Sequence, residues 1–214
     1  MIDPNDFPVL EREVWLNHAA ISPWPAAVVQ AMRAFVHDNA AHGPLHYDRW
    51  LATERRLRER AARLLDAERT DDVALIKNTS EGLSLIASGL DWRPGDRMLC
   101  VADEFPSNHL PWIHLVPDHV DVVEVPFSTS DPESLLIDAL DDRTRLVAVS
   151  SVRYDSGVRL DLDRLGRACH EAGALLAVDA IQQLGALPLS VRDLPVDFVV
   201  AGSHKWLLAP EGLA

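Results

Sequence analysis

Six short apolar runs, each of four to six residues, constrain the fold of this chain more than any other feature of its sequence. They occupy residues 73–76, 97–101, 120–125, 146–150, 175–178 and 198–201. The runs lack the regular alternation of apolar and polar side chains that a strand shows when one of its faces meets water. They therefore indicate strands that are covered on both faces, which is typical of a largely parallel sheet.

Amphipathic stretches separate these runs and have the apolar spacing of helices that cover a sheet. Between the runs the helical candidates are residues 81–89, 107–116, 131–140 and 162–172, and two earlier candidates are residues 26–38, after Pro25, and 46–65. This alternation predicts an α/β fold, a three-layer sandwich around a mostly parallel sheet. We expect residues 1–24 to form an N-terminal segment and residues 25–214 to form the main domain.

Composition narrows the class of protein and of partner. The chain has 214 residues, 48% of them hydrophobic, which is enough to bury a core in one large domain or two small ones. Its net charge of −13 argues against nucleic acid and anionic membrane surfaces as partners, although a local site can still hold a small anion. Two cysteines without CxxC spacing, no signal peptide and no run long enough to span a membrane predict a cytoplasmic protein.

Polar residues follow four of the runs, and in parallel sheets ligands bind beyond the carboxyl ends of the strands. The four segments are Asn78-Thr79-Ser80-Glu81, Asp103-Glu104-Phe105-Pro106-Ser107-Asn108, Asp179-Ala180-Ile181-Gln182 and Gly202-Ser203-His204-Lys205. We expect all four on the same edge of the sheet, which makes that edge the candidate site.

Signatures of several other chemistries are missing from the sequence. It contains no GxGxxG after a strand, no GxxxxGKS/T, no HExxH and no GxSxG, so nicotinamide, P-loop, zinc-peptidase and serine-hydrolase chemistry lack their usual motifs. His42 and His46 are four residues apart, but Gly43 and Pro44 interrupt any helix between them. We interpret the two histidines as part of a solvated loop and helix start, and we predict no metal site.

Each polar residue at the candidate edge has a functional and a purely structural interpretation. Thr79 and Ser80 stand at the start of a predicted helix, where hydroxyls and free amides either bind an anion or simply cap the helix. Asp179 ends a buried strand, so its carboxylate either meets a cationic or hydrogen-bonding partner or caps the next turn. Gln182 faces the same cavity or the solvent.

Lys205 follows the small residues Gly202 and Ser203, which let a ligand approach closely, and a desolvated lysine can act as a Schiff-base nucleophile. A loop lysine is usually exposed, but apolar residues at 206–208 favour burial here. Phe105 either stacks on a flat ligand or covers the core. An anion site, an aromatic ring, a buried acid and a lysine are together the parts that hold pyridoxal 5′-phosphate (PLP).

The same segments resemble the class V aminotransferase family of fold-type I PLP enzymes, which includes cysteine desulfurases, selenocysteine lyases, kynureninases and isopenicillin-epimerase-like proteins. The resemblance covers the chain from residue 15 onward, and its specific motifs are Asn78-Thr79-Ser80-Glu81-Gly82, Glu104-Phe105-Pro106-Ser107-Asn108, Val178-Asp179-Ala180-Ile181-Gln182 and Ser203-His204-Lys205-Trp206-Leu207-Leu208. It implies that residues 25–214 are the PLP-binding large domain of an enzyme that is a homodimer when full length.

By position, the resemblance assigns the catalytic roles. It implies that Lys205 forms the Schiff base with PLP and that Asp179 pairs with the pyridine nitrogen, so that the ring accepts electrons from a substrate Cα. Gln182 would contact the phenolic oxygen of the cofactor. His204, beside the lysine, would be either a phosphate contact or a proton carrier.

The resemblance also assigns the remaining contacts with the cofactor. Thr79 and Ser80 would bind the phosphate from one side, Ser203 together with the neighbouring histidine would bind it from the other, and Phe105 would cover one face of the ring. Desulfurase-type members have a histidine in this loop, whereas this chain has Phe105-Pro106-Ser107-Asn108. That departure argues against a housekeeping cysteine desulfurase and is nearer the kynureninase and epimerase-like pattern.

The sequence stops at Ala214, whereas members of the family continue into a C-terminal small domain. The resemblance therefore places the arginine for the substrate carboxylate, and the catalytic cysteine of desulfurases, beyond residue 214. Cys100 and Cys169 are interpreted as small buried residues. The leading hypothesis is a PLP enzyme that acts on a small amino acid by transamination or by C–S or Cβ lyase chemistry. The alternative is a truncated, catalytically silent cofactor-binding remnant or interaction protein.

Overall fold

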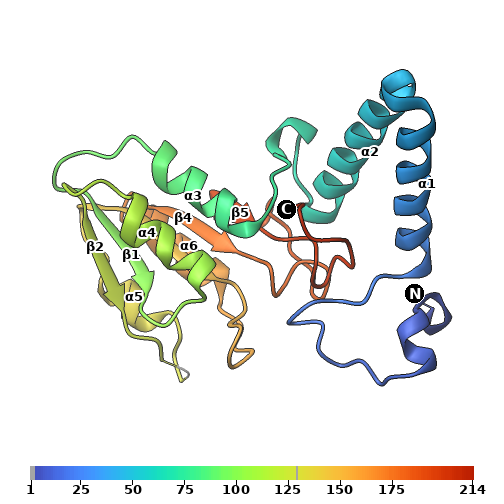
Figure 1. Cartoon of the computed structure of the whole chain (residues 1–214). Coiled ribbons are helices and arrows are strands. Elements are labelled where there is room, and N and C mark those ends of the chain that lie inside the picture. Colours follow the sequence, from blue (N-terminus) through green and yellow to red (C-terminus); the bar gives the residue numbers. More distant parts are fainter. Residues whose placement is uncertain (1–2, 129) are drawn as a thin grey trace.

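A computed structural model of the chain describes residues 3–128 and 130–214 (Figure 1). Five strands form one sheet in the order β2-β1-β3-β4-β5, and every neighbouring pair is parallel. The strands are β1 (Arg97–Val101), β2 (Asp121–Val125), β3 (Thr144–Ser150), β4 (Leu175–Asp179) and β5 (Phe198–Val200). The predicted α/β fold with a mostly parallel sheet is confirmed.

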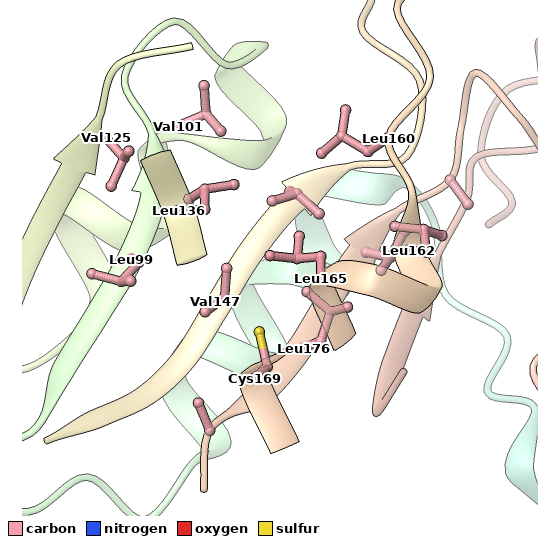
Figure 2. Packing of buried hydrophobic residues seen from close by; sticks show 14 of the residues in the cluster. Leu99, Val101, Val125, Leu136, Val147, Leu160, Leu162, Leu165, Cys169 and Leu176 are labelled. Atoms are coloured by element: carbon pink, nitrogen blue, oxygen red, sulfur yellow. The ribbon is translucent and has the colours of Figure 1, made fainter. Parts of the chain in front are cut away.

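Helices cover both faces of this sheet and complete the three layers. Helices α3 (Thr79–Gly89) and α4 (Leu110–Leu115) pack on one face, and α5 (Ser134–Asp138) and α6 (Leu162–Glu171) pack on the other. Because successive side chains of a strand point to opposite faces, the same strands supply both layers of the core. Leu99 and Val147 belong to the same buried cluster as Leu165 and Cys169 of α6 (Figure 2), whereas Cys100 packs in the cluster that includes residues of α3 and α4.

Two longer helices, α1 (Ala26–His42) and α2 (Tyr47–Leu65), form a hairpin beside the sheet (Figure 1). The hairpin contributes little to the core, because α1 has no buried residue and α2 has only Ala62. Before α1 the chain makes two short 3-10 turns, Pro4–Asp6 and Pro8–Glu11. Further 3-10 turns are Gly43–His46, Thr70–Asp72 and Pro106–Asn108.

Several predicted elements are shorter than expected, and one is wrong. Residues 73–76 do not form a strand: Ile76 exchanges two backbone hydrogen bonds with Ala214, of 3.0 and 2.7 Å, and no ladder continues from that pair in the described chain. The predicted helix at 107–116 is divided into a 3-10 turn and α4, which Pro111 restarts. The predicted helix at 131–140 is reduced to α5.

The register of the sheet brings the carboxyl ends of three strands together. Ser150, the last residue of β3, pairs with Asp179, the last residue of β4, and Asp179 pairs in turn with Val200 of β5. The polar segments that follow these strands are therefore neighbours in space. Within residues 3–128 and 130–214, no helix is both long and apolar enough to cross a membrane.

Candidate active site

Asp179 lies at the centre of this edge, between β3 and β5, with 2% of its surface exposed. One carboxylate oxygen accepts a hydrogen bond of 2.9 Å from the backbone N–H of Ile181. Burial raises the pKa of Asp179 to about 7; the Glu104 carboxylate also raises it, while the Ile181 N–H and the Lys205 ammonium oppose the change. This buried acid is thus poised to take a cationic partner.

Lys205 follows β5 through residues 201–204 and is only 7% exposed. Burial lowers the pKa of its ammonium group, and the negative charge of Asp179 partly offsets this effect. The Nζ atom lies 5.5 Å from the centroid of the Phe105 ring, which packs edge-on against Tyr154. The lysine, the acid and the aromatic ring predicted from the sequence are therefore at one edge of the sheet.

The backbone of residues 202–208, called here the lysine turn, is unusually constrained. Leu208 has φ +58°, a conformation that is uncommon for a bulky side chain and is typical of functional turns. Gly185, with φ +97°, lets the turn approach, because a Cβ at this position would lie 2.5 Å from the Trp206 carbonyl oxygen. The fold thus holds the lysine turn tightly against the segment that follows Asp179.

Thr79 offers a buried hydroxyl to the same region. Asn78, not Thr79 or Ser80, caps helix α3 by accepting the Glu81 N–H at 2.8 Å. Thr79 is 3% exposed, and its Oγ1 has no hydrogen-bond partner in the described structure. A Cβ on Gly202 would lie 3.1 Å from this oxygen, so Gly202 leaves space beside it. A free hydroxyl at the N-terminus of an eleven-residue helix suits an anion.

The other predicted anion contacts differ in how available they are. Ser80 Oγ donates to Ser107 Oγ at 2.9 Å, at the open side of the helix start. Ser203 Oγ instead donates to the carbonyl oxygens of Pro210 and Leu213, so its hydroxyl stabilises the following loop. The pKa of His204 is lowered by partial burial and by the neighbouring lysine, which favours the neutral imidazole.

Gln182 connects the edge to the N-terminal segment. Its Nε2 donates to the Ala19 carbonyl at 3.0 Å, and its Oε1 accepts from Trp206 Nε1 at 3.1 Å. The Trp206 ring lies 5.4 Å from that of His18, centroid to centroid. The N-terminal segment thus packs over the lysine turn and orients the Gln182 amide.

A buried ion pair behind the site received no role in the sequence analysis. Glu104 accepts the N–H of Ser150 at 2.9 Å and its hydroxyl at 2.7 Å. Arg153 Nη1 lies 3.9 Å from Glu104 Oε1, and both side chains are at most 2% exposed. The pair anchors the Phe105 loop to the end of β3. Arg153 could have been found by the rule that identified the other residues, because it follows the run that ends at Ser150.

Both cysteines are structural. Cys100 and Cys169 are completely buried, and burial raises the pKa of each thiol to about 12. Neither thiol forms the thiolate that nucleophilic sulfur chemistry requires at neutral pH. Their interpretation as small core residues agrees with this burial.

Comparison with known proteins identifies the family. The model of the family described as "Aminotransferase class-V" matches residues 14–214. A probable cysteine desulfurase of Methanothermobacter thermautotrophicus is 36% identical over 214 residues, which cover 97% of this chain and 53% of the relative. One of Pyrococcus abyssi is 31% identical, over 97% of this chain and 54% of the relative. The chain spans about half the length of these curated relatives.

Solved structures agree with this result. The cysteine desulfurase CsdA of Escherichia coli matches with a TM-score of 0.84 and 26% identity, covering all of this chain and 57% of that one. The apo cysteine desulfurase of Thermococcus onnurineus matches with a TM-score of 0.85 and 27% identity, over all of this chain and 56% of that one. A C-DES mutant with glycine linked to its PLP cofactor, 22% identical over all of this chain and 58% of that one, has the same fold at a TM-score of 0.91. As the sequence motifs predicted, the chain belongs to the aminotransferase class-V family.

Proposed function

We propose that this chain is the PLP-binding part of an enzyme that acts on an amino acid and that Lys205 holds the cofactor covalently. The observation that carries the proposal is a buried lysine of lowered pKa that shares one sheet edge with a buried strand-end acid and an aromatic ring. A lysine of this kind is a better nucleophile toward an aldehyde than an exposed one, because more of it is neutral.

The residues present fit PLP as a ligand. The unpartnered hydroxyl of Thr79, the α3 N-terminus and the space beside Gly202 suit a phosphate. Asp179 suits a protonated pyridine nitrogen, since an opposite charge would favour the ionised carboxylate. Phe105 offers a ring face to a flat ligand. Gln182, Ser80 and His204 remain proposed contacts, and for Ser203 we propose a role in shaping the turn.

When bound, PLP supplies an electron sink that stabilises negative charge at the Cα of an amino acid. The ε-amine of Lys205 would take the proton from that carbon, and the lowered pKa that burial gives the amine increases its neutral, proton-accepting fraction. Asp179 would hold a proton on the pyridine nitrogen throughout. The neutral imidazole of His204 is a second proton acceptor beside the lysine.

We propose a sulfur-containing amino acid as the substrate and cleavage of a C–S bond as the reaction. The names of the relatives at 36% and 31% identity support this choice. Transamination and epimerisation share the same Cα chemistry and are the competing outcomes. The silent-remnant alternative gains no support from the described site, in which lysine, acid and anion contact are all present.

Two further features belong to the same proposal. Exposed apolar side chains on the α1–α2 hairpin, among them Phe35 at 51% and Leu45 at 79%, would suit a homodimer contact. We also propose a cytoplasmic location, as the two unpaired buried cysteines suggest. Sedimentation of the full-length protein tests the first, and localisation of a tagged full-length protein tests the second.

The test of the function is cofactor binding, followed by amino acid addition. PLP is titrated into the purified chain while visible absorbance is followed, with Lys205→Ala and Lys77→Ala as a matched pair, since Lys77 is the only other lysine. The band should be lost only in Lys205→Ala.

Thr79→Val should weaken PLP binding about tenfold, as expected for one lost hydrogen bond, while Thr53→Val on α2 should not. Cysteine should then change the band and release sulfide in the full-length protein. A band that persists in Lys205→Ala would refute the proposal.

A further inference from the structure

Three metal-ligating side chains meet where α1 joins α2, far from the lysine turn in the sequence. His42 Nδ1 lies 3.0 Å and His46 Nδ1 lies 2.7 Å from the same oxygen, Asp38 Oδ1. The three ligand atoms lie within 4.8 Å of one another. The side chains are partly exposed, at 48% for His42, 29% for His46 and 26% for Asp38, so an ion can reach them from solvent.

The backbone explains how a helix break produces this cluster rather than preventing it. Asp38 and His42 are four residues apart on the last turn of α1 and therefore share one face. Gly43, with φ +57°, ends the helix, and Pro44 begins a 3-10 turn that reverses the chain. The reversal returns His46 to the same face, where its ring centroid is 4.8 Å from that of His42.

The donor set favours a particular class of ion. Two imidazole nitrogens and one carboxylate oxygen suit Zn²⁺ and neighbouring transition metals, whereas Mg²⁺ and Ca²⁺ prefer oxygen ligands alone. Ligand atoms around a tetrahedral Zn²⁺ ion are about 3.3 Å apart, given bonds of about 2.0 Å. The carboxylate oxygen lies 3.0 and 2.7 Å from the two nitrogens, slightly closer than this value, and since all three atoms lie within 4.8 Å of one another, side-chain rotations would bring them around one ion. A water molecule would complete the fourth position.

We propose that Asp38, His42 and His46 form a Zn²⁺ site that fastens the junction of α1 and α2. A bound ion would stabilise the hairpin, whose two helices gain little from packing because only Ala62 of them is buried. The negative end of the α1 helix dipole adds attraction for a cation at this position. The site lies outside the proposed cofactor pocket and does not depend on PLP binding.

The experiment is a calorimetric titration of the metal-free, tag-free chain with Zn²⁺, repeated with Mg²⁺. We expect saturable binding of one Zn²⁺ per chain and no binding of Mg²⁺ in the same concentration range. His46→Gln and His42→Gln should each weaken Zn²⁺ binding at least tenfold. His37→Gln, an exposed histidine on α1 outside the cluster, is the matched control and should bind Zn²⁺ like the unaltered chain.

Thermal unfolding distinguishes a Zn²⁺ site that stabilises the hairpin from weak Zn²⁺ binding elsewhere on the surface. Zn²⁺ should raise the thermal unfolding midpoint by several degrees in the unaltered chain and in His37→Gln, and not in His46→Gln. If the three residues merely form hydrogen bonds, no saturable binding occurs, and the proposal is wrong. Equal Zn²⁺ affinity in His46→Gln and His37→Gln would overturn it as well, because the ion would then bind elsewhere.

Discussion

Replacing Asp179 by Asn should stabilise the cofactor-free chain while removing its proposed partner for the pyridine nitrogen. Asn has nearly the same shape and can still accept the Ile181 N–H, so the change removes mainly the ionisable group. The pKa of Asp179 is raised from 3.8 to about 7 in the folded chain by burial. Between these two values the folded chain holds a proton that the unfolded chain has released, so stability falls as pH rises through this window.

The size of the effect follows from the width of that window. From pH 5 to pH 7 the window spans about two pH units, and each unit corresponds to about 1.4 kcal/mol, which gives about 3 kcal/mol. The unaltered chain should therefore lose about 3 kcal/mol of unfolding free energy between pH 5 and pH 8 through this group, whereas Asp179→Asn should not. The difference in unfolding free energy between the two chains should shift by that amount in favour of the variant. Urea unfolding of both chains at both pH values measures this, and other titrating groups cancel in the difference.

An exposed acid provides the control for this experiment. Asp163 pairs with Arg167, which lowers the pKa of its carboxyl group, so it is ionised in both folded and unfolded chains across pH 5 to 8. Asp163→Asn should therefore show no pH-dependent difference. If Asp179→Asn also shows none, the Asp179 carboxylate is ionised at pH 5 in the folded chain, and the argument from burial is refuted.

Two further predictions concern the packing that supports the site. Gly166→Ala should destabilise the chain by roughly 2 kcal/mol or more, because the new Cβ would lie 2.2 Å from the Pro195 carbonyl oxygen; Gly89→Ala, which has open space, should not, as urea unfolding would show. Arg153→Met should cost about 3–5 kcal/mol by leaving the Glu104 carboxylate buried without its cation, and adding Glu104→Gln should recover much of the loss. A loss below about 1 kcal/mol in the single variant would contradict this prediction, because the buried contact would then contribute little to stability.

Most of the fold could be predicted from apolar periodicity, because parallel strands buried on both faces leave a plain signal. Residues 97–101 and 175–178 correspond closely to β1 and β4. Residues 73–76 carry the same signal without becoming a strand, because a strand also needs a partner along its length. Among residues 3–128 and 130–214, the backbone of Ile76 pairs only with that of Ala214. The sequence of a run indicates that it is buried, but it does not indicate which other segment will pair with it as a neighbouring strand.

The candidate site was predictable where chemistry follows a strand end, as for Asp179 and Lys205. The contacts of the site were harder to predict where several neighbouring groups could fill the same role. Asn78 takes the cap, which leaves the Thr79 hydroxyl unpartnered, and Ser203 bonds to a loop ten residues further on. The three-residue cluster around His46 needed a chain reversal whose direction depends on the φ of Gly43. Such choices depend on tertiary geometry.

The most direct test of the central claim is to find the residue that carries the cofactor. The chain is incubated with PLP, treated with borohydride to fix any imine, digested, and mapped by mass spectrometry. The two lysines compete in the same experiment: Lys77 has 68% of its side chain exposed beside Glu81, and Lys205 is buried beside Asp179. The account predicts the label on Lys205 alone. Labelling of Lys77 to an equal or greater extent would contradict it.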